Sequence, residues 1–446
     1  MRAIVILSLL SSSVILTGCS GEAGVIDLAG DDTVNPFLED PNQGKMDSHY
    51  FNPDGIEIEV DVQGTVEAPA GRRGLAPAMV AQYAMTHLHR QGVLYLESLA
   101  EDASAPERVE WLVDGVWLPA VKVDTDSLDD AAQFRIRGIN AVLLHQHTEF
   151  GEVGRTLNVP VPLRPYNLMA DAGDTCAKPD GHMTLSNSIY WYLWDPTRSE
   201  CTMETEDLLL TVSSVLPRAD SYPEYDQLVA DNKVTAVILF GQIGDTMDEW
   251  DPGFRNLGRM ARNLERAGYS EVEAPLGQRF AKDVQGVTIE IDLYSPKEFS
   301  GLSDHANFGN FERAIAEHEV VAYDGHSMLG ASDFWARPTY PDFYQVFLYG
   351  GCLGYEYYVA PIVQAKGGWG AVDIVSSVIE VSADANYYAG PFFSKLEKAI
   401  EQDYRVSWKE ILGAVRTSVG DSTFGASGVR GNCFDPEGDR CALDIE

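Results

Sequence analysis

The chain has 446 residues, of which 45% are hydrophobic and 22% are charged. This length allows two or three domains with full cores, and the ordinary apolar fraction argues against disorder of the whole chain. The 32 Lys and Arg residues against 68 Asp and Glu residues give a formal net charge of −36, so the surface repels polyanions. We therefore expect no nucleic-acid partner and no charge-driven binding to an anionic membrane.

The N-terminal residues have the pattern of an export signal. Arg2 precedes an apolar run over residues 3–16, which is too short for a membrane span. The run ends in Leu16-Thr17-Gly18-Cys19, which resembles the bacterial lipoprotein box, where cleavage before the cysteine leaves a lipidated amino terminus. Ser20 follows the cysteine, which resembles the outer-membrane sorting pattern. We expect residues 1–18 to be a signal peptide and Cys19 to anchor the protein to the outer membrane through lipid alone; a plain signal peptide that contains a cysteine is the alternative.

The remaining cysteines fit an oxidising compartment. If Cys19 is lipidated and Cys352 is reactive, four cysteines are left, and an even number outside the cytoplasm favours disulfides. Proximity in sequence favours the pairs Cys176–Cys201 and Cys433–Cys441, although four cysteines allow three connectivities. Cys352 is the cysteine that this count leaves reduced.

Two regions precede the expected catalytic part of the chain. Residues 19–54 are rich in Gly, Asp, Asn and Pro without periodicity, which is typical of a flexible tether. Residues 55–165 contain short alternating apolar runs and predict a β-rich domain, a small sandwich with one helix over residues 76–90.

The β-rich region contains two close histidine pairs, His87/His89 and His145/His147. Imidazoles one residue apart on a strand point to the same face and can share a metal ion. No acidic ligand or further histidine follows at a metal-ligand spacing, so we prefer ordinary structural histidines and keep a metal site as a third alternative. No cofactor is expected.

Residues 166–420 predict an α/β domain. After an aromatic-rich segment over residues 170–204, apolar runs alternate with amphipathic segments, which argues for a largely parallel sheet with helices on both faces. The expected strands are 208–215, 234–240, 287–294, 320–323, 346–349 and 372–381, and the expected helices are 222–232, 253–267, 308–318, 385–402 and 407–418. Residues 421–446 are expected to form an acidic tail with a disulfide loop.

Two of these strands each lead into one reactive side chain. Val320-Val321-Ala322-Tyr323 precedes Asp324-Gly325-His326, and Val346-Phe347-Leu348-Tyr349 precedes Gly350-Gly351-Cys352. The chain between them is long enough for a crossover, so parallel neighbours would bring His326 and Cys352 to the same sheet edge. There the imidazole could take the thiol proton and later protonate a leaving amine.

This arrangement resembles the caspase–haemoglobinase group of cysteine peptidases, in which a strand ending in His-Gly precedes a strand ending in the catalytic Cys. The resemblance covers about residues 208–381. It implies a caspase-like, mostly parallel sheet, Cys352 as nucleophile and His326 as acid and base, with backbone at Gly325, Ser327 and Gly351 near the oxyanion. The chain departs from the family at Ser327, where the family usually has Gly. Asp333 and Asp373 are the acidic residues expected to suit a basic substrate side chain.

Two hypotheses of different classes follow. The first is a surface-anchored cysteine endopeptidase with a Cys-His dyad, acting on a peptide or protein. The second is a non-catalytic cell-surface lipoprotein on a peptidase-like fold, which binds protein or glycan. The reactivity of Cys352 discriminates between them, because only the first requires a thiolate.

Overall fold

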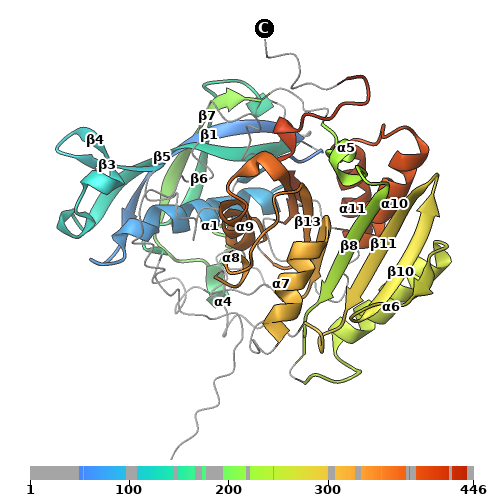
Figure 1. The fold of residues 1–446 in the computed structure, drawn as a ribbon. Helices are drawn as coiled ribbons and strands as arrows, with labels where there is room; N and C mark the ends of the chain where they lie inside the picture. The colour runs from blue at the N-terminus through green and yellow to red at the C-terminus, as the bar shows by residue number, and fades with distance from the viewer. Residues whose placement is uncertain are drawn as a thin grey trace, which may run out of the picture.

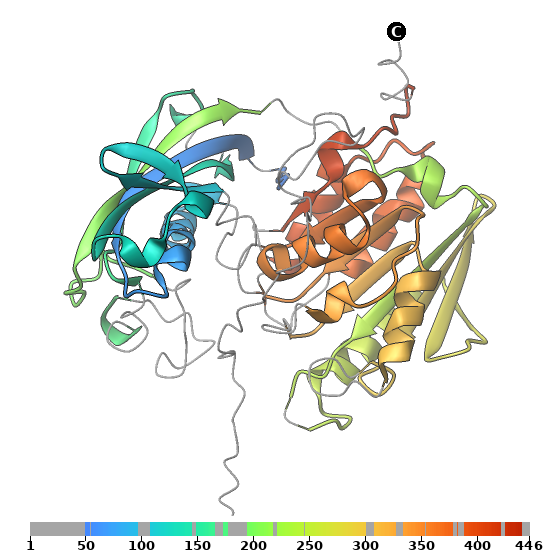
Figure 2. The same cartoon turned by 60° about the vertical axis from the view of Figure 1, so that its left-hand side comes forward.

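The computed structural model describes residues 50–53, 55–96, 108–144, 149–165, 173–176, 194–216, 221–244, 246–299, 307–326, 333–352, 354–377, 381, 388–420 and 424–438. Over these residues the chain forms two β-sheets with helices packed against them, one sheet antiparallel and the other mixed. The two sheets lie side by side, the antiparallel sheet built from the first half of the chain and the mixed sheet from the second (Figures 1 and 2). The α/β class expected from the sequence is confirmed.

The antiparallel sheet has the order β4-β3-β5-β1-β7-β6, with β2 also paired to β5. Its strands are β1 (Gly55–Glu67), β2 (Leu94–Leu96), β3 (Val109–Val113), β4 (Val116–Pro119), β5 (Ala131–Leu144), β6 (Thr156–Pro162) and β7 (Thr205–Val215). Helix α1 (Ala76–Arg90) packs on this sheet, because Val80, Tyr83, Ala84 and Leu88 form one buried helical stripe. The expected sandwich is therefore wrong: α1 covers the apolar face that a second sheet would have covered.

Strand β7 moves the expected domain boundary. It pairs with β1 and β6 in the antiparallel sheet, so that sheet extends to residue 215 and not to 165. Leu208, Leu210 and Val212 alternate with more exposed residues, the pattern of a strand buried on one face. From the sequence this strand was expected in the parallel sheet, because strands and helices alternate in the chain from residue 208 onward.

The mixed sheet has the order β15-β14-β13-β12-β8-β11-β10-β9. Its strands are β8 (Lys233–Phe240), β9 (Ser270–Val272), β10 (Gln278–Val284), β11 (Val287–Tyr294), β12 (Val320–Asp324), β13 (Gln345–Tyr349), β14 (Val372–Ser376) and β15 (Gly425–Ser427). The five strands from β14 to β11 in this order are parallel, and the outer pairings β11–β10, β10–β9 and β14–β15 are antiparallel. Every residue of β12, β13 and β14 is buried, as expected of parallel strands covered on both faces.

Helices cover both faces of the mixed sheet (Figure 1). One layer consists of α6 (Pro252–Arg266), α10 (Ala389–Glu401) and α11 (Trp408–Val419), with the short α5 (Tyr225–Leu228); the other consists of α7 (Phe308–Glu317), α8 (Asp333–Ala336) and α9 (Ala360–Ala365). Short 3₁₀ turns lie at Arg73–Leu75, Ala120–Lys122, Thr125–Ser127, Trp369–Ala371 and Val429–Gly431, and the π-helical turn η9 lies at Tyr355–Val359. None of the helices in the described ranges is both long and apolar enough to cross a bilayer.

Residues expected in the tether and in the tail belong to the folded body. Phe51 forms an antiparallel bridge with Ala426 of β15, and the Tyr50 hydroxyl donates to the Ser376 carbonyl at 2.6 Å. Arg430 forms a buried ion pair with Glu57 of β1, which joins the two sheets. Removing one partner of such a pair typically costs about 3–5 kcal/mol, so residues 424–434 help hold the two halves together. The expected boundaries at 54 and 421 are thus corrected.

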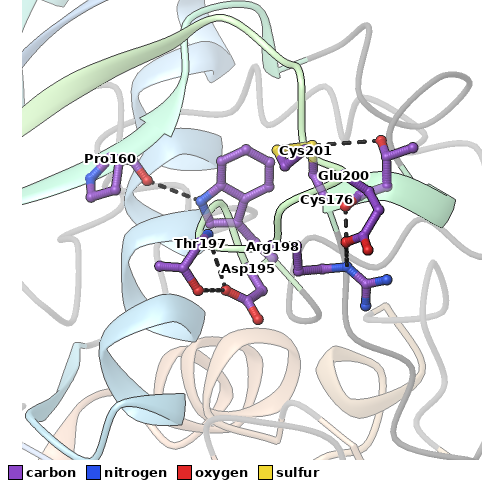
Figure 3. The surroundings of a disulfide bond; sticks show 9 residues. Pro160, Cys176, Asp195, Thr197, Arg198, Glu200 and Cys201 are labelled. Carbon is purple, nitrogen blue, oxygen red and sulfur yellow. Dashed lines mark hydrogen bonds and ion pairs between the residues drawn. A yellow bond between two sulfur atoms is a disulfide. The ribbon is translucent and has the colours of Figure 1, made fainter.

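The disulfide Cys176–Cys201 closes a loop of the first half of the chain (Figure 3). It joins the short helix α4 (Gly173–Cys176) to the segment before β7, beside the buried Trp194, whose indole N–H donates to the Pro160 carbonyl at 3.0 Å. A native disulfide of this kind typically stabilises by about 2–4 kcal/mol. Cys433 is also disulfide-bonded, whereas Cys19 and Cys441 lie outside the described residues, so the Cys433–Cys441 pair stays a prediction.

Candidate active site

The structure places His326 and Cys352 at the same edge of the mixed sheet. Strands β12 and β13 are parallel neighbours, and their register pairs Tyr323 with Tyr349. His326 follows Tyr323 by three residues, and Cys352 follows Tyr349 by three. The two side chains thus start from equivalent points beyond the carboxyl ends of adjacent strands, as the sequence predicted.

This edge also contains the point where the chain order of the sheet reverses. β8 is the first of the parallel strands, and its neighbours β11 and β12 lie on opposite sides of it. Open α/β sheets bind their ligands in the crevice at such a point, outside the carboxyl ends of the strands. The loops after β8 and β12, the second of which includes His326, flank this point of the sheet.

The imidazole of His326 is half-buried and contacts the loop after β8. Its Nε2 lies 2.7 Å from the carbonyl oxygen of Ile243. A carbonyl can only accept, so Nε2 has the proton in the neutral ring, and Nδ1 is the nitrogen that can take another. The Ile243 contact therefore fixes both the tautomer and the ring orientation that a base requires.

A buried carboxylate shapes the loop that presents Ile243. Asp251 accepts from the backbone N–H groups of Ile243 (3.0 Å), Gly244 (2.5 Å) and Gly253 (2.8 Å). It is the N-cap of α6, with Pro252 as the first helical residue. This role was not predicted from the sequence, although an Asp-Pro pair directly before an amphipathic helix is a recognisable N-cap pattern.

The thiol of Cys352 is partly exposed and reduced. Its Sγ lies 3.5 Å from the carbonyl oxygen of Val381, to which it can donate. The π-helical turn η9 starts three residues later, and such turns occur frequently at functional sites. The expectation that Cys352 stays out of the disulfides is confirmed.

The two loops share one construction, Tyr-x-Gly followed by the reactive residue. An added Cβ at Gly325 would lie 2.6 Å from the Tyr323 hydroxyl, and one at Gly351 would lie 2.6 Å from the Tyr349 ring. Any larger residue at either position would displace a tyrosine. Glycine is therefore required in both loops because the main chain runs directly over an aromatic ring.

Asp324 is a buried carboxyl group two residues before His326. Burial raises its pKa to about 8, and a hydrogen bond from Asn256 and the charge of Arg259 oppose that shift only in part. Its side chain lines a small cavity between β8, α6 and the start of α10. Carboxyl groups with perturbed pKa values concentrate at functional sites, so Asp324 further supports a functional site at this edge of the sheet.

Asp373 does not lie where a substrate pocket requires it. It is the second residue of β14 and pairs with Val346 near the start of β13, whereas His326 and Cys352 lie beyond the strand ends. Its buried carboxylate accepts from the hydroxyl of Tyr344, the indole of Trp408 and the amide of Asn432. Asp373 is a structural residue, and the prediction of a pocket role for it is wrong.

The other predicted residues are only partly described. Asp333 starts α8, on the crossover between β12 and β13, and its side chain lies outside the described residues. Ser327 lies outside them as well, so the departure from the family pattern stays untested. Gly325 and Gly351 are buried at the expected edge.

The histidine pairs of the first half remain without a test. The His87 imidazole is buried and lies 2.9 Å from the Gln91 amide, and the side chains of His89, His145 and His147 are outside the described part of the chain. Over the residues that the structure describes, no group of three or more His, Cys, Asp or Glu side chains is arranged to hold a metal ion.

No protein-family model matches the chain, and no curated protein or solved structure matches it either. The resemblance to the caspase–haemoglobinase group thus depends on His326, Cys352 and the strands before them.

Proposed function

We propose that the protein is a cysteine endopeptidase in which Cys352 is the nucleophile and His326 the acid and base. The observation that supports this most is the equivalent placement of the two residues, three positions beyond a register pair of adjacent parallel strands. A structural role would require no such equivalence. The Ile243 carbonyl at His326 Nε2 adds the third group that orients the base in activated nucleophile systems.

The proposed reaction starts with proton transfer from the Cys352 thiol to Nδ1 of His326. For this transfer the thiol gives up its contact with the Val381 carbonyl and comes within hydrogen-bond reach of the imidazole. The thiolate attacks the peptide carbonyl carbon, and the resulting oxyanion is stabilised by backbone N–H groups such as that of Cys352. The C–N bond then breaks as the imidazolium gives its proton to the leaving amine. Water hydrolyses the thioester, with His326 as base, and restores the thiol.

The proposal includes a caspase-like arrangement of the mixed sheet. Its support is the run of five parallel strands from β14 to β11, with helices on both faces and the two reactive residues after neighbouring strands. The flanking β9, β10 and β15 are added to that core through antiparallel pairings.

A thiol-directed peptidyl probe tests the proposal. We expect a peptidyl acyloxymethyl ketone to label the wild-type protein at Cys352, and His326→Ala to reduce labelling strongly, since the thiolate fraction depends on the imidazole. Peptides with Arg or Lys before the scissile bond should be tried first, because a net charge of −36 attracts cationic substrates. Mass spectrometry of the digest identifies the labelled residue.

The probe also separates the two classes of function. A folded wild-type protein that neither labels at Cys352 nor cleaves a mixed peptide library would contradict the peptidase proposal. The non-catalytic cell-surface lipoprotein, which binds protein or glycan, would then be the better hypothesis.

We also propose that Cys19 is lipidated and that the protein is held in the cell envelope of its source, at the outer membrane. The support is the Leu-Thr-Gly-Cys sequence after a short apolar run. In a bacterial host, wild-type protein is expected in the membrane fraction, and Cys19→Ala in the soluble fraction. Equal partition of the two proteins would show that the lipoprotein prediction is wrong.

A further inference from the structure

Three buried tyrosine rings lie beneath the loops that contain His326 and Cys352. Tyr323 and Tyr349 stack with ring centroids 5.2 Å apart, and Tyr349 stacks on Tyr358 of η9 at 3.9 Å. All three are almost fully buried. The stack extends from β12 through β13 to the turn after Cys352, so it supports both loops.

The hydroxyl of Tyr323 is enclosed by the two loops that fix the imidazole. It donates to the main-chain carbonyl of His326 at 2.7 Å. An added Cβ would lie 2.9 Å from it at Gly241 and 2.6 Å from it at Gly325, so the main chain of both loops touches the hydroxyl. Gly241 begins the loop that leads to Ile243, the residue whose carbonyl accepts from His326.

The main chain of Tyr323 is held from two further directions. Its carbonyl oxygen accepts from the Gly350 N–H at 2.9 Å, which belongs to the loop that leads to Cys352. The same oxygen accepts from the hydroxyl of Tyr388, the residue that precedes α10. Tyr323 is therefore bonded to the loop of each reactive residue.

We propose that Tyr323 is a positioning residue for the dyad. Its hydroxyl fixes the main chain at His326, so that Nδ1 of the imidazole faces Cys352. This inference rests on the proposed function. Burial raises the pKa of Tyr323 well above its usual range, so the hydroxyl stays protonated and remains a donor. Without it, the His326 carbonyl loses its partner, and the turn is free to rotate the imidazole away from the Ile243 carbonyl.

The test is the pH dependence of Cys352 alkylation by iodoacetamide, which needs no peptide substrate. Tyr323→Phe is expected to reduce the alkylation rate about tenfold near pH 6, toward that of His326→Ala, because less thiolate is present. Tyr349→Phe is the matched control. It removes the equivalent hydroxyl from the neighbouring strand, which interacts with the Tyr358 side chain and not with the main chain of His326, and it keeps the ring stack. Its pH profile is expected to match that of the wild type.

The outcomes distinguish this inference from the proposed function. If the wild type and His326→Ala alkylate alike, no dyad exists and both proposals fail. If they differ but Tyr323→Phe behaves like Tyr349→Phe, the dyad stands and the positioning role is wrong. If Tyr323→Phe does not fold, Tyr388→Phe decides, because it loosens the same strand end from the α10 side; an unchanged profile then overturns the inference.

Discussion

Cys352→Ser and His326→Ala should each abolish nearly all peptide hydrolysis, by at least about a thousandfold in kcat/KM, and the double variant should be no worse than either single one. The reason is that nucleophile and base act as one unit, so removing one makes the other useless. The measurement is kcat/KM on a short peptide that the wild-type protein cleaves.

His326→Gln is the matched control for the loop. A glutamine amide can still donate to the Ile243 carbonyl, yet it cannot take a proton from the thiol. It should therefore lose as much activity as His326→Ala while unfolding closer to the wild-type temperature. Independent, multiplicative losses in the double variant would contradict a dyad.

The parts of the fold that were predictable are those where local pattern and tertiary burial agree. Residues 287–294 were expected as a strand and form β11, because apolar residues alternate with polar ones at its start and its last four residues are all buried. Strand β10 was not expected. Its sequence, Gln278–Val284, is mostly polar, and it is a strand because it pairs along its whole length with β11. Such pairing depends on tertiary contacts, which the intrinsic β-propensity of the residues does not predict.

The candidate site was predictable at His326 and Cys352 and not at the groups that contact them. The thiol of Cys352 and the imidazole of His326 are recognisable from residue type alone, and the apolar strands before them predict that both lie at the same edge of the sheet. The Ile243 contact joins a carbonyl to a residue 83 positions away, and every residue has a carbonyl, so no sequence pattern marks it. The prediction for Asp373 failed for the opposite reason. Asp373 is near Cys352 in sequence, but it is the second residue of β14, and only the carboxyl ends of the strands meet at the candidate site.

Asp324→Asn is expected to change the pH dependence of stability more than any other single carboxyl substitution at this edge. Burial raises the pKa of Asp324 in the folded protein to about 8, far above the usual range of an aspartate, because it disfavours the charged form. The unfolded chain therefore loses the proton first, and folding must retain it. The free energy of unfolding thus falls as pH rises from about 4 to about 8, by roughly 1.4 kcal/mol per pH unit, and this contribution is constant above that range.

An asparagine has no proton to lose and keeps an oxygen for the Asn256 amide, so its variant lacks this decline. Denaturant unfolding at several pH values should therefore give similar stability for wild type and Asp324→Asn near pH 4 and a growing advantage for the variant up to pH 8. Asp129→Asn, which removes the same charge from an exposed position, is the control and should follow the wild type. If the free energy of unfolding of wild type and Asp324→Asn changes with pH in parallel, Asp324 is ionised in the folded protein. Asn256 and Arg259, which line the cavity beside it, would then have to stabilise its negative charge.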